Sequence, residues 1–314
     1  MKSRIHPKYK TRYRVTHWRD YERGLVQRGD ITIWLSPEAM DAWKAKPSGR
    51  RGAQPKFSDL AIEAALTLRL VFHLPLRQAE GFLGSLFKLM GVGLEVPDHT
   101  TLSRRNADLQ VSLASRTGDG PIDLIIDSSG LTIVGEGEWA AAKHGENGRR
   151  GWKKLHLGVD ACGEIVAQVL TNSNVDDGTT GVAIIKDVAR PIRRVIADAA
   201  YDTRRVYDAA ECKGADVVVP PSSTATTSSP RRWSKARDRT VRRVKEVGRR
   251  QWKKESGYHR QGRVENTFFR FKTVIGDRLR ARTIASQETE AAIGCNLLNR
   301  MRVLGWPASV KMVR

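Results

Sequence analysis

Residues 124–134 read LIIDSSGLTIV, and this stretch decides the fold. Its first three residues form a short apolar run of the kind that is buried in a central β-strand, and residues 131–134 continue the run after Gly130. Asp127 follows the first run directly. A carboxylate right after a buried strand lies at the carboxyl edge of the sheet, where α/β proteins build their sites. The stretch therefore predicts an α/β fold with an acidic group at that edge.

The rest of the chain extends this strand into a mixed sheet. A Gly-containing turn at 160–163 separates two apolar runs and predicts a hairpin. Strands are expected at 155–159, 165–170, 195–197 and 217–219, and helices at 179–189, 203–213, 264–275 and 287–304. Three meandering strands, followed by alternating helices and strands, predict a mixed α/β sheet.

Three helices are expected before the sheet. Ser58 can cap the first, residues 76–90 fit the second, and Asp98 can cap the third. The third helix would present Arg104 and Arg105, which suits a helix-turn-helix unit that binds DNA. An ordinary three-helix bundle explains these residues equally well.

The chain divides into four parts. They are a basic N-terminal segment at 1–55, a helical DNA-binding region at 56–120, a catalytic core at 121–282 and a C-terminal helix at 283–314. With 40% hydrophobic and 28% charged residues, the composition is that of a globular protein. Three cysteines are too few for a disulfide framework or a zinc site, and no apolar run approaches the roughly 18 residues of a membrane span. The N-terminus also lacks the apolar run of a secretory signal. We therefore expect neither a secreted nor a membrane protein.

The net charge of +21 is concentrated in one stretch of the core. Residues 230–282 contain 19 basic and 5 acidic residues, with Trp233 and Trp252 interleaved. Such a density repels itself unless a polyanion neutralises it, and nucleic acid is the usual one. The alternative is a solvated basic loop.

Three carboxylates are candidates for catalysis. Asp127 and Asp198 each follow an apolar strand, and Glu265 lies at the start of an amphipathic helix. Each also has a structural interpretation: the two aspartates can cap turns, and Glu265 can stabilise its helix dipole. Other carboxylates rank lower, with Asp160 expected in the hairpin turn and Asp202 as a helix cap. The remaining carboxylates that rank below the three candidates are Asp123, Asp176 and Asp177.

A basic surface around clustered carboxylates suits one kind of chemistry. The basic groups hold a polyphosphate, while the carboxylates hold hard cations that activate water and stabilise the leaving oxygen. Two Mg²⁺ ions bridged by carboxylates are the usual arrangement for displacement at phosphorus.

The ordered motifs resemble those of a known family. They are IDSSGL at 126–131, GEGEW at 135–139, KHG at 143–145, WKKLHL at 152–157, ADAAYDT at 197–203, PP at 220–221, SGYHR at 256–260 through Glu265 to FK at 271–272, and LNRM at 298–301. From about residue 55 onward, the sequence resembles bacterial insertion-sequence transposases of the DDE class, in the insertion-sequence-five family.

The resemblance implies a ribonuclease-H-like core in which Asp127, Asp198 and Glu265 bind two Mg²⁺ ions, with Mn²⁺ able to substitute. It implies an enzyme that binds the terminal inverted repeats of its element, cleaves DNA strands there and joins the 3′ ends to target DNA. The expected partners are double-stranded DNA and at least a second copy of the chain. The expected location is the bacterial cytoplasm, in association with the nucleoid.

The family also carries a Tyr, Arg, Glu, Lys signature that holds the DNA end. Tyr258 and Lys272 fall at the matching offsets, seven residues before and after Glu265. The Arg position is Gln261 here, flanked by Arg260 and Arg263. The predicted DNA-binding residues are therefore Tyr258, Arg260, Arg263, Lys272, Arg104 and Arg105. Histidines 144, 156 and 259 are not at metal-ligand spacing, and structural or DNA-contact roles are expected for them.

Two alternatives share these features. A non-catalytic relic of a transposase would bind DNA as a repressor or architectural protein, and a ribonuclease H would share the core chemistry. Acidic residues at all three triad positions favour an active enzyme over the relic. A ribonuclease H would not need the helical N-terminal part or the basic stretch.

Overall fold

The computed structural model describes most of the chain. The described residues are 13–30, 35, 37–47, 49, 51–52, 54–113, 120–135, 151–227, 235–305 and 309–311. The motif at 143–145, most of the motif at 135–139 and residues 231–233 of the basic stretch lie outside them.

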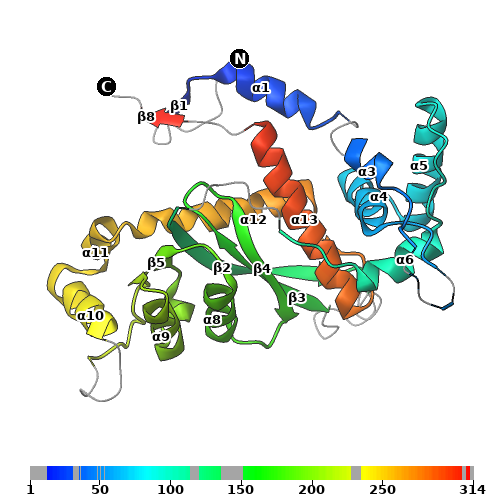
Figure 1. Ribbon diagram of the computed structural model, residues 1–314. Coiled ribbons are helices and arrows are strands. Elements are labelled where there is room, and N and C mark those ends of the chain that lie inside the picture. The colour runs from blue at the N-terminus through cyan, green and yellow to red at the C-terminus, as the bar shows by residue number, and fades with distance from the viewer. Residues whose placement is uncertain are drawn as a thin grey trace, which may run out of the picture.

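A six-stranded mixed sheet forms the centre of the molecule (Figure 1). Its strands are β2 (Ile122–Ile133), β3 (Trp152–Val159), β4 (Ile165–Asn172), β5 (Ile192–Ile196), β6 (Asp216–Val218) and β7 (Arg278–Leu279). The order is β4-β3-β2-β5-β6, and β7 pairs with the far end of β2. Strands β2, β3 and β4 are antiparallel neighbours, whereas β5 and β6 run parallel to β2. The predicted meander and mixed sheet are confirmed, in the order of a ribonuclease-H-like core.

The placement of Asp127 at a strand end was wrong. Residues 122–133 form one continuous strand, so Asp127 lies within β2, opposite Leu157 of β3. The Ser-Ser-Gly sequence stays extended because β3 pairs along its whole length, and the ring of Trp152 lies over Gly130. Because β5 ends at Ile196, which pairs with Ile125, Asp127 still lies beyond the end of that neighbouring strand.

Helices cover both faces of the sheet (Figure 1). Helices α12 (Gly262–Val274) and α13 (Ile284–Leu304) pack with Ile125 and Leu131 of β2. On the other face, α8 (Asp177–Asp187) and α9 (Arg204–Cys212) pack with Leu124 and Ile126. Burial on both faces explains why the strand begins as an unbroken apolar run.

A second core is built from helices that precede the sheet. They are α3 (Pro37–Asp41), α4 (Asp59–Val71), α5 (Leu76–Leu89) and α6 (His99–Asp108), and α1 (Trp18–Gln27) lies outside this core. The predicted caps are confirmed, since Ser58 accepts the amide of Ala61 and Asp98 accepts those of Thr100 and Thr101. Three residues of α13 complete this core: Ile293, Leu297 and Met301.

The two ends of the chain meet in a small antiparallel sheet. Strand β1 (Tyr13–Val15) pairs with β8 (Ser309–Lys311). Helix α1 approaches α13 so closely that a Cβ on Gly24 would overlap the carbonyl of Leu304. The four-part division at 55, 120 and 282 stays a prediction, although α13 belongs to both cores.

Two helices extend from the sheet between β6 and α12. They are α10 (Lys235–Val247) and α11 (Arg249–Glu255), and they contain most of the basic residues in the described part of the basic stretch (Figure 1). Arg237 of α10 pairs with Asp202 through Nε and Nη2 at 2.8 and 2.9 Å. The prediction that Asp202 caps a helix was therefore wrong: Thr203 stands at the N-cap of α9, and Asp202 anchors α10.

Among the helices that the structure describes, none combines the length and the hydropathy that a membrane-spanning segment requires.

Candidate active site

Asp127 is the central carboxylate of the candidate site. Its Oδ1 accepts the amide of Ser128 at 2.8 Å. The pKa of Asp127 is raised to about 6, chiefly by burial and in addition by the charges of three carboxylates, whereas that hydrogen bond lowers it. The three carboxylates are Asp198, Glu265 and Asp177. Three other carboxylates thus lie within electrostatic reach of Asp127.

Asp198 comes two residues after the end of β5. It caps the 3₁₀ turn Ala199–Tyr201 and accepts the amide of Ala200 at 2.9 Å, so the predicted cap is confirmed. Burial raises the pKa of Asp198, and the charge of Asp177 adds to the effect. A carboxylate fixed by a turn at the end of a strand is well placed to act beside Asp127.

Glu265 reaches the site from α12. It lies in the first turn of the helix, on the exposed face, while Val264 and Phe268 pack into the core below. Its charge raises the pKa of Asp127, which places the third carboxylate near the first. The structure therefore brings together the three residues that the sequence singled out.

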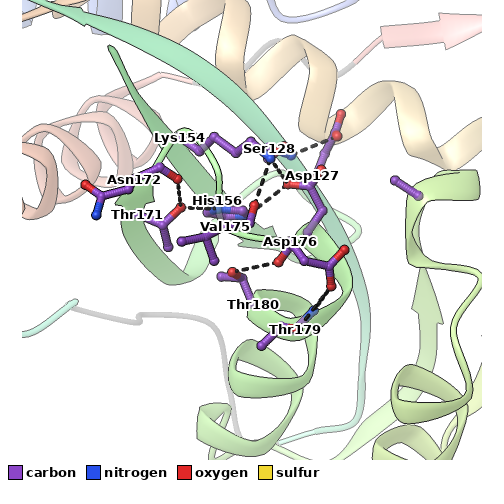
Figure 2. Close-up of polar contacts among 12 residues, drawn as sticks. Asp127, Ser128, Lys154, His156, Thr171, Asn172, Val175, Asp176, Thr179 and Thr180 are labelled. Atoms are coloured by element: carbon purple, nitrogen blue, oxygen red, sulfur yellow. Dashed lines mark hydrogen bonds and ion pairs between the residues drawn. The ribbon is translucent and has the colours of Figure 1, made fainter. Parts of the chain in front are cut away.

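A fourth carboxylate, ranked low from the sequence, joins this group. Asp177 is the first residue of α8, and its Oδ1 lies 3.3 Å from the Nζ of Lys154. Lys154 also donates to the carbonyl of Val175 at 2.9 Å. Figure 2 shows Asp127 and Ser128 of β2 beside Lys154 of β3. Lys154 thus places one positive charge next to the acidic cluster.

Two buried residues support the cluster. His156, two positions after Lys154 on β3, shares a hydrogen bond with Oγ1 of Thr171 at 2.9 Å, and its Nδ1 lies 3.7 Å from Asp177 (Figure 2). Burial lowers the pKa of His156 to about 4, so the ring is neutral at physiological pH. Tyr201 packs against α8 where Gly181 leaves room for its ring. Lys154 and His156 are two residues apart in a strand and therefore lie on the same face of β3. This spacing was the signal in the sequence that both residues support the site.

The residues just before α12 tie that helix to β2. Gln261, which stands where the family has Arg, is buried and donates from Nε2 to the carbonyl of Ile126 at 3.1 Å. Tyr258 is half-buried; burial raises its pKa, and the charges of Asp198, Asp127 and Glu265 raise it further. Tyr258 therefore lies within electrostatic reach of the triad, and its contact with DNA stays a prediction.

The other predicted DNA-binding residues differ in their surroundings. Arg260 pairs with the buried Asp123, which also accepts from Nε of Arg193 at 2.8 Å. Burial opposes ionisation of Asp123, but the Arg193 hydrogen bond and the two guanidinium charges lower its pKa. In the free protein Arg260 is thus engaged with a protein carboxylate. Its contact with DNA stays a prediction.

Arg263 and Lys272 both lie on α12, the first exposed and the second half-buried. Arg104 is exposed on α6, whereas Arg105 donates to the carbonyl of Phe57 at 2.9 Å and pairs with Asp59. The DNA contacts of these four residues stay predictions.

The donor set suits a divalent cation. Carboxylate oxygens are the ligands that hard cations prefer, and a bound cation would offset both the burial of the Asp127 charge and its repulsion by the neighbouring carboxylates. Within the described ranges, no group of three or more His, Cys, Asp or Glu side chains is already arranged around a metal position. The chemistry of the residues fits a metal, and we expect binding to draw the carboxylates together.

This mixed sheet, with its order β4-β3-β2-β5-β6 and helices on both faces, is that of a ribonuclease-H-like core. Comparison with known families agrees. Two family profiles, both described as "Transposase DDE domain", match residues 26–136 and 118–300. Because the second covers more than half of the chain, the protein belongs to the DDE transposases.

Membership of this family gives the protein a coarse function. DDE transposases are polynucleotidyl transferases and endonucleases that act on DNA, and they generally use divalent metal ions. The first match begins at residue 26, so the resemblance extends further towards the N-terminus than the motifs alone indicated. The insertion-sequence-five assignment is compatible with both matches and stays a prediction.

Proposed function

We propose that the protein binds the terminal inverted repeats of its insertion sequence, cleaves DNA there and joins the 3′ ends to target DNA. The observation that carries the proposal is that β2, the turn after β5 and the first turn of α12 bring Asp198 and Glu265 within electrostatic reach of Asp127. These residues are far apart in the sequence, and three different elements hold them. A cluster of like charges, costly to the fold, is typical of a catalytic site.

The three carboxylates would hold two Mg²⁺ ions, with Mn²⁺ able to replace them. When bound, the ions activate the attacking oxygen and stabilise the leaving oxygen of an in-line displacement at phosphorus. Asp127 would be a ligand of both ions. Asp198 would complete the binding of one ion, and Glu265 that of the other. Gln261 would keep Glu265 in register with Asp127, because it bonds the residue next to Asp127 in β2.

The basic groups would hold the DNA. Lys272 follows Glu265 by about two helical turns and therefore shares its face, which suits contact with a phosphate near the cut. The hydroxyl of Tyr258 would donate to the same strand. Helices α10 and α11, with exposed Arg242, Arg249 and Arg250, would add contacts to the backbone that are independent of sequence.

Two further parts of the proposal concern recognition of the terminal repeat and pairing of the two element ends. Helices α4 to α6, with Arg104 and Arg105 on the last, would read the terminal repeat as a helix-turn-helix unit. Two element ends are joined together, so we expect at least a dimer on DNA. Sizing the protein with and without end DNA tests this, and a monomer with end DNA bound would contradict it.

The direct test is metal-dependent nicking of a labelled duplex that carries the element's own end. We expect wild type to nick in Mg²⁺, and Asp127→Asn, Asp198→Asn and Glu265→Gln to bind the end without nicking it. Glu288→Gln, which changes an exposed glutamate on α13, is the matched control and should nick normally. Nicking by any of the three triad variants would refute the assignment. Binding without nicking by wild type would favour the non-catalytic relic.

The phosphate contact has its own readout. We expect Lys272→Ala to weaken binding to the end and to reduce the slope of log affinity against log salt by about 1. An unchanged slope would contradict a phosphate contact at Lys272.

A further inference from the structure

The hydroxyl of Tyr201 is buried without a hydrogen-bond partner in the described part of the chain. The side chain is 1% exposed, so the hydroxyl does not reach bulk water. A buried hydroxyl of this kind destabilises the folded state, because it loses its hydrogen bonds to water and gains none. Phenylalanine would fill the same space without this penalty. The hydroxyl therefore indicates a partner that reaches it in another state of the molecule.

The ring of Tyr201 packs against α8 one turn from Asp177. A Cβ on Gly181 would lie 2.7 Å from the ring, and Asp177 precedes Gly181 by four residues on the same face of the helix. Burial raises the pKa of Tyr201, and the charges of Asp177, Asp127 and Asp198, in that order of size, raise it further. The hydroxyl thus lies within electrostatic reach of the carboxylate cluster, and Asp177 acts on it most strongly.

Asp177 is held only loosely in the metal-free protein. Its Oδ1 lies 3.3 Å from the Nζ of Lys154 and 3.7 Å from the Nδ1 of His156, both longer than the 2.7–2.9 Å of a strong charge-assisted hydrogen bond. Lys154 also donates to the carbonyl of Val175 at 2.9 Å, so it keeps an acceptor when Asp177 turns away. A rotation of the Asp177 side chain therefore breaks no strong contact.

We propose that Tyr201 is a positioning residue of the metal site, whose hydroxyl donates to Asp177 once the cations are bound and holds this carboxylate beside the triad. The inference rests on the proposed function, because it needs cations at Asp127, Asp198 and Glu265. The cations attract Asp177 away from Lys154, and the hydrogen bond fixes its orientation. Asp177 then adds a fourth negative charge beside the cations. Hydrogen-bond partners of the carboxylates around a metal typically contribute about 10- to 100-fold to its affinity.

The test uses the full chain and compares two properties of Tyr201→Phe. In chelator, its urea midpoint should be no lower than that of wild type, because the substitution removes only the unpartnered hydroxyl. Its Kd for Mn²⁺, read from the electron paramagnetic resonance signal of the unbound ion, should rise about 10- to 100-fold. Tyr207→Phe is the matched control. Tyr207 is equally buried, but the charges that act on it are those of Asp202 and Arg237, so this variant should bind Mn²⁺ as wild type does.

A double variant identifies the partner of the hydroxyl. Asp177→Ala should weaken Mn²⁺ binding, and the addition of Tyr201→Phe should cause no further loss. If the two losses multiply, Tyr201 does not act through Asp177 and the proposal is overturned. A lower urea midpoint for Tyr201→Phe would also overturn it, since the hydroxyl would then stabilise the fold itself.

The variant Asp127→Asn separates this proposal from the proposed function. If Asp127→Asn loses Mn²⁺ binding while Tyr201→Phe keeps the affinity of wild type, the positioning role is overturned and the metal site stands. If wild type does not bind Mn²⁺, or if Asp127→Asn binds it equally well, the metal site and the positioning role are both overturned.

Discussion

The carboxylate cluster should make the metal-free protein less stable than a variant that lacks its central charge. We predict that Asp127→Asn stabilises the fold at neutral pH while it abolishes cleavage. Asparagine has nearly the same shape, and its Oδ1 still accepts the amide of Ser128, so the packing is kept. What changes is that the side chain no longer ionises among three other carboxylates.

The size of the effect follows from the pKa of Asp127. The pKa is raised from 3.8 to about 6, and each unit corresponds to about 1.4 kcal/mol, which gives an upper limit of about 3 kcal/mol. The side chain is partly exposed, so solvent screening lowers the expected gain to about 1–3 kcal/mol. Between pH 4 and 6 the folded protein binds more protons than the unfolded chain, so wild type loses stability as pH rises through this window. The gain of Asp127→Asn should be near zero at pH 4 and complete above pH 6.

Urea unfolding in chelator, followed by circular dichroism from pH 3.5 to 8, measures this difference. Glu288→Gln is the control, because Glu288 is exposed outside the carboxylate cluster and a surface substitution usually changes stability by less than about 0.5 kcal/mol. If Asp127→Asn is no more stable than wild type at pH 7.5, or if its gain does not depend on pH, the reasoning is refuted.

Three further predictions concern the supports of the site. Adding Mg²⁺ to metal-free wild type should raise its melting temperature, and at a Mg²⁺ concentration a hundred times the Kd the stabilisation should be about 2.7 kcal/mol. An equal rise for Asp127→Asn would contradict metal binding by the triad. Gly181→Ala should destabilise the fold by about 1–3 kcal/mol, because the new Cβ would lie 2.7 Å from the ring of Tyr201. Gly84→Ala is the control: a Cβ at this position on α5 meets open space, so the substitution should be neutral or stabilising in the same urea titration. Arg237→Ala should cost about 3–5 kcal/mol, because it leaves Asp202 buried without its guanidinium partner, and a loss below about 1 kcal/mol would show that water replaces the pair.

The sequence predicted the elements of the sheet because their signals are local. The apolar run at 124–126, the hairpin turn at Asp160 and the caps Ser58 and Asp98 each depend on neighbouring residues, and the structure confirms them all. The placement of Asp127 failed because it depends on a remote partner. Small polar residues at 128–130 are typical of a turn, but pairing with β3 keeps them extended.

The supporting residues of the site were missed for a related reason. Nothing in the sequence around Asp177 separates it from Asp176, since both lie at the start of a helix. The difference is that Asp176 caps α8 through the amide of Thr179, whereas Asp177 faces Lys154 on β3. Only the packing of α8 against the sheet assigns one aspartate to the helix and the other to the site.

Helix α13 explains how the two cores act as one body. Ile293, Leu297 and Met301 recur every four residues and pack against the N-terminal helices, while Ala291, Cys295 and Leu298 pack against α12 and the sheet. Gly294 lets α12 come close, since a Cβ there would lie 3.0 Å from the ring of Phe271. A helix with two apolar stripes is buried nearly all round, so its sequence shows no single amphipathic face. The helices that are proposed to read the DNA end and the helix that carries Glu265 are thus packed on the same rigid element, and a repeat bound at α6 would set the position of the strand at α12.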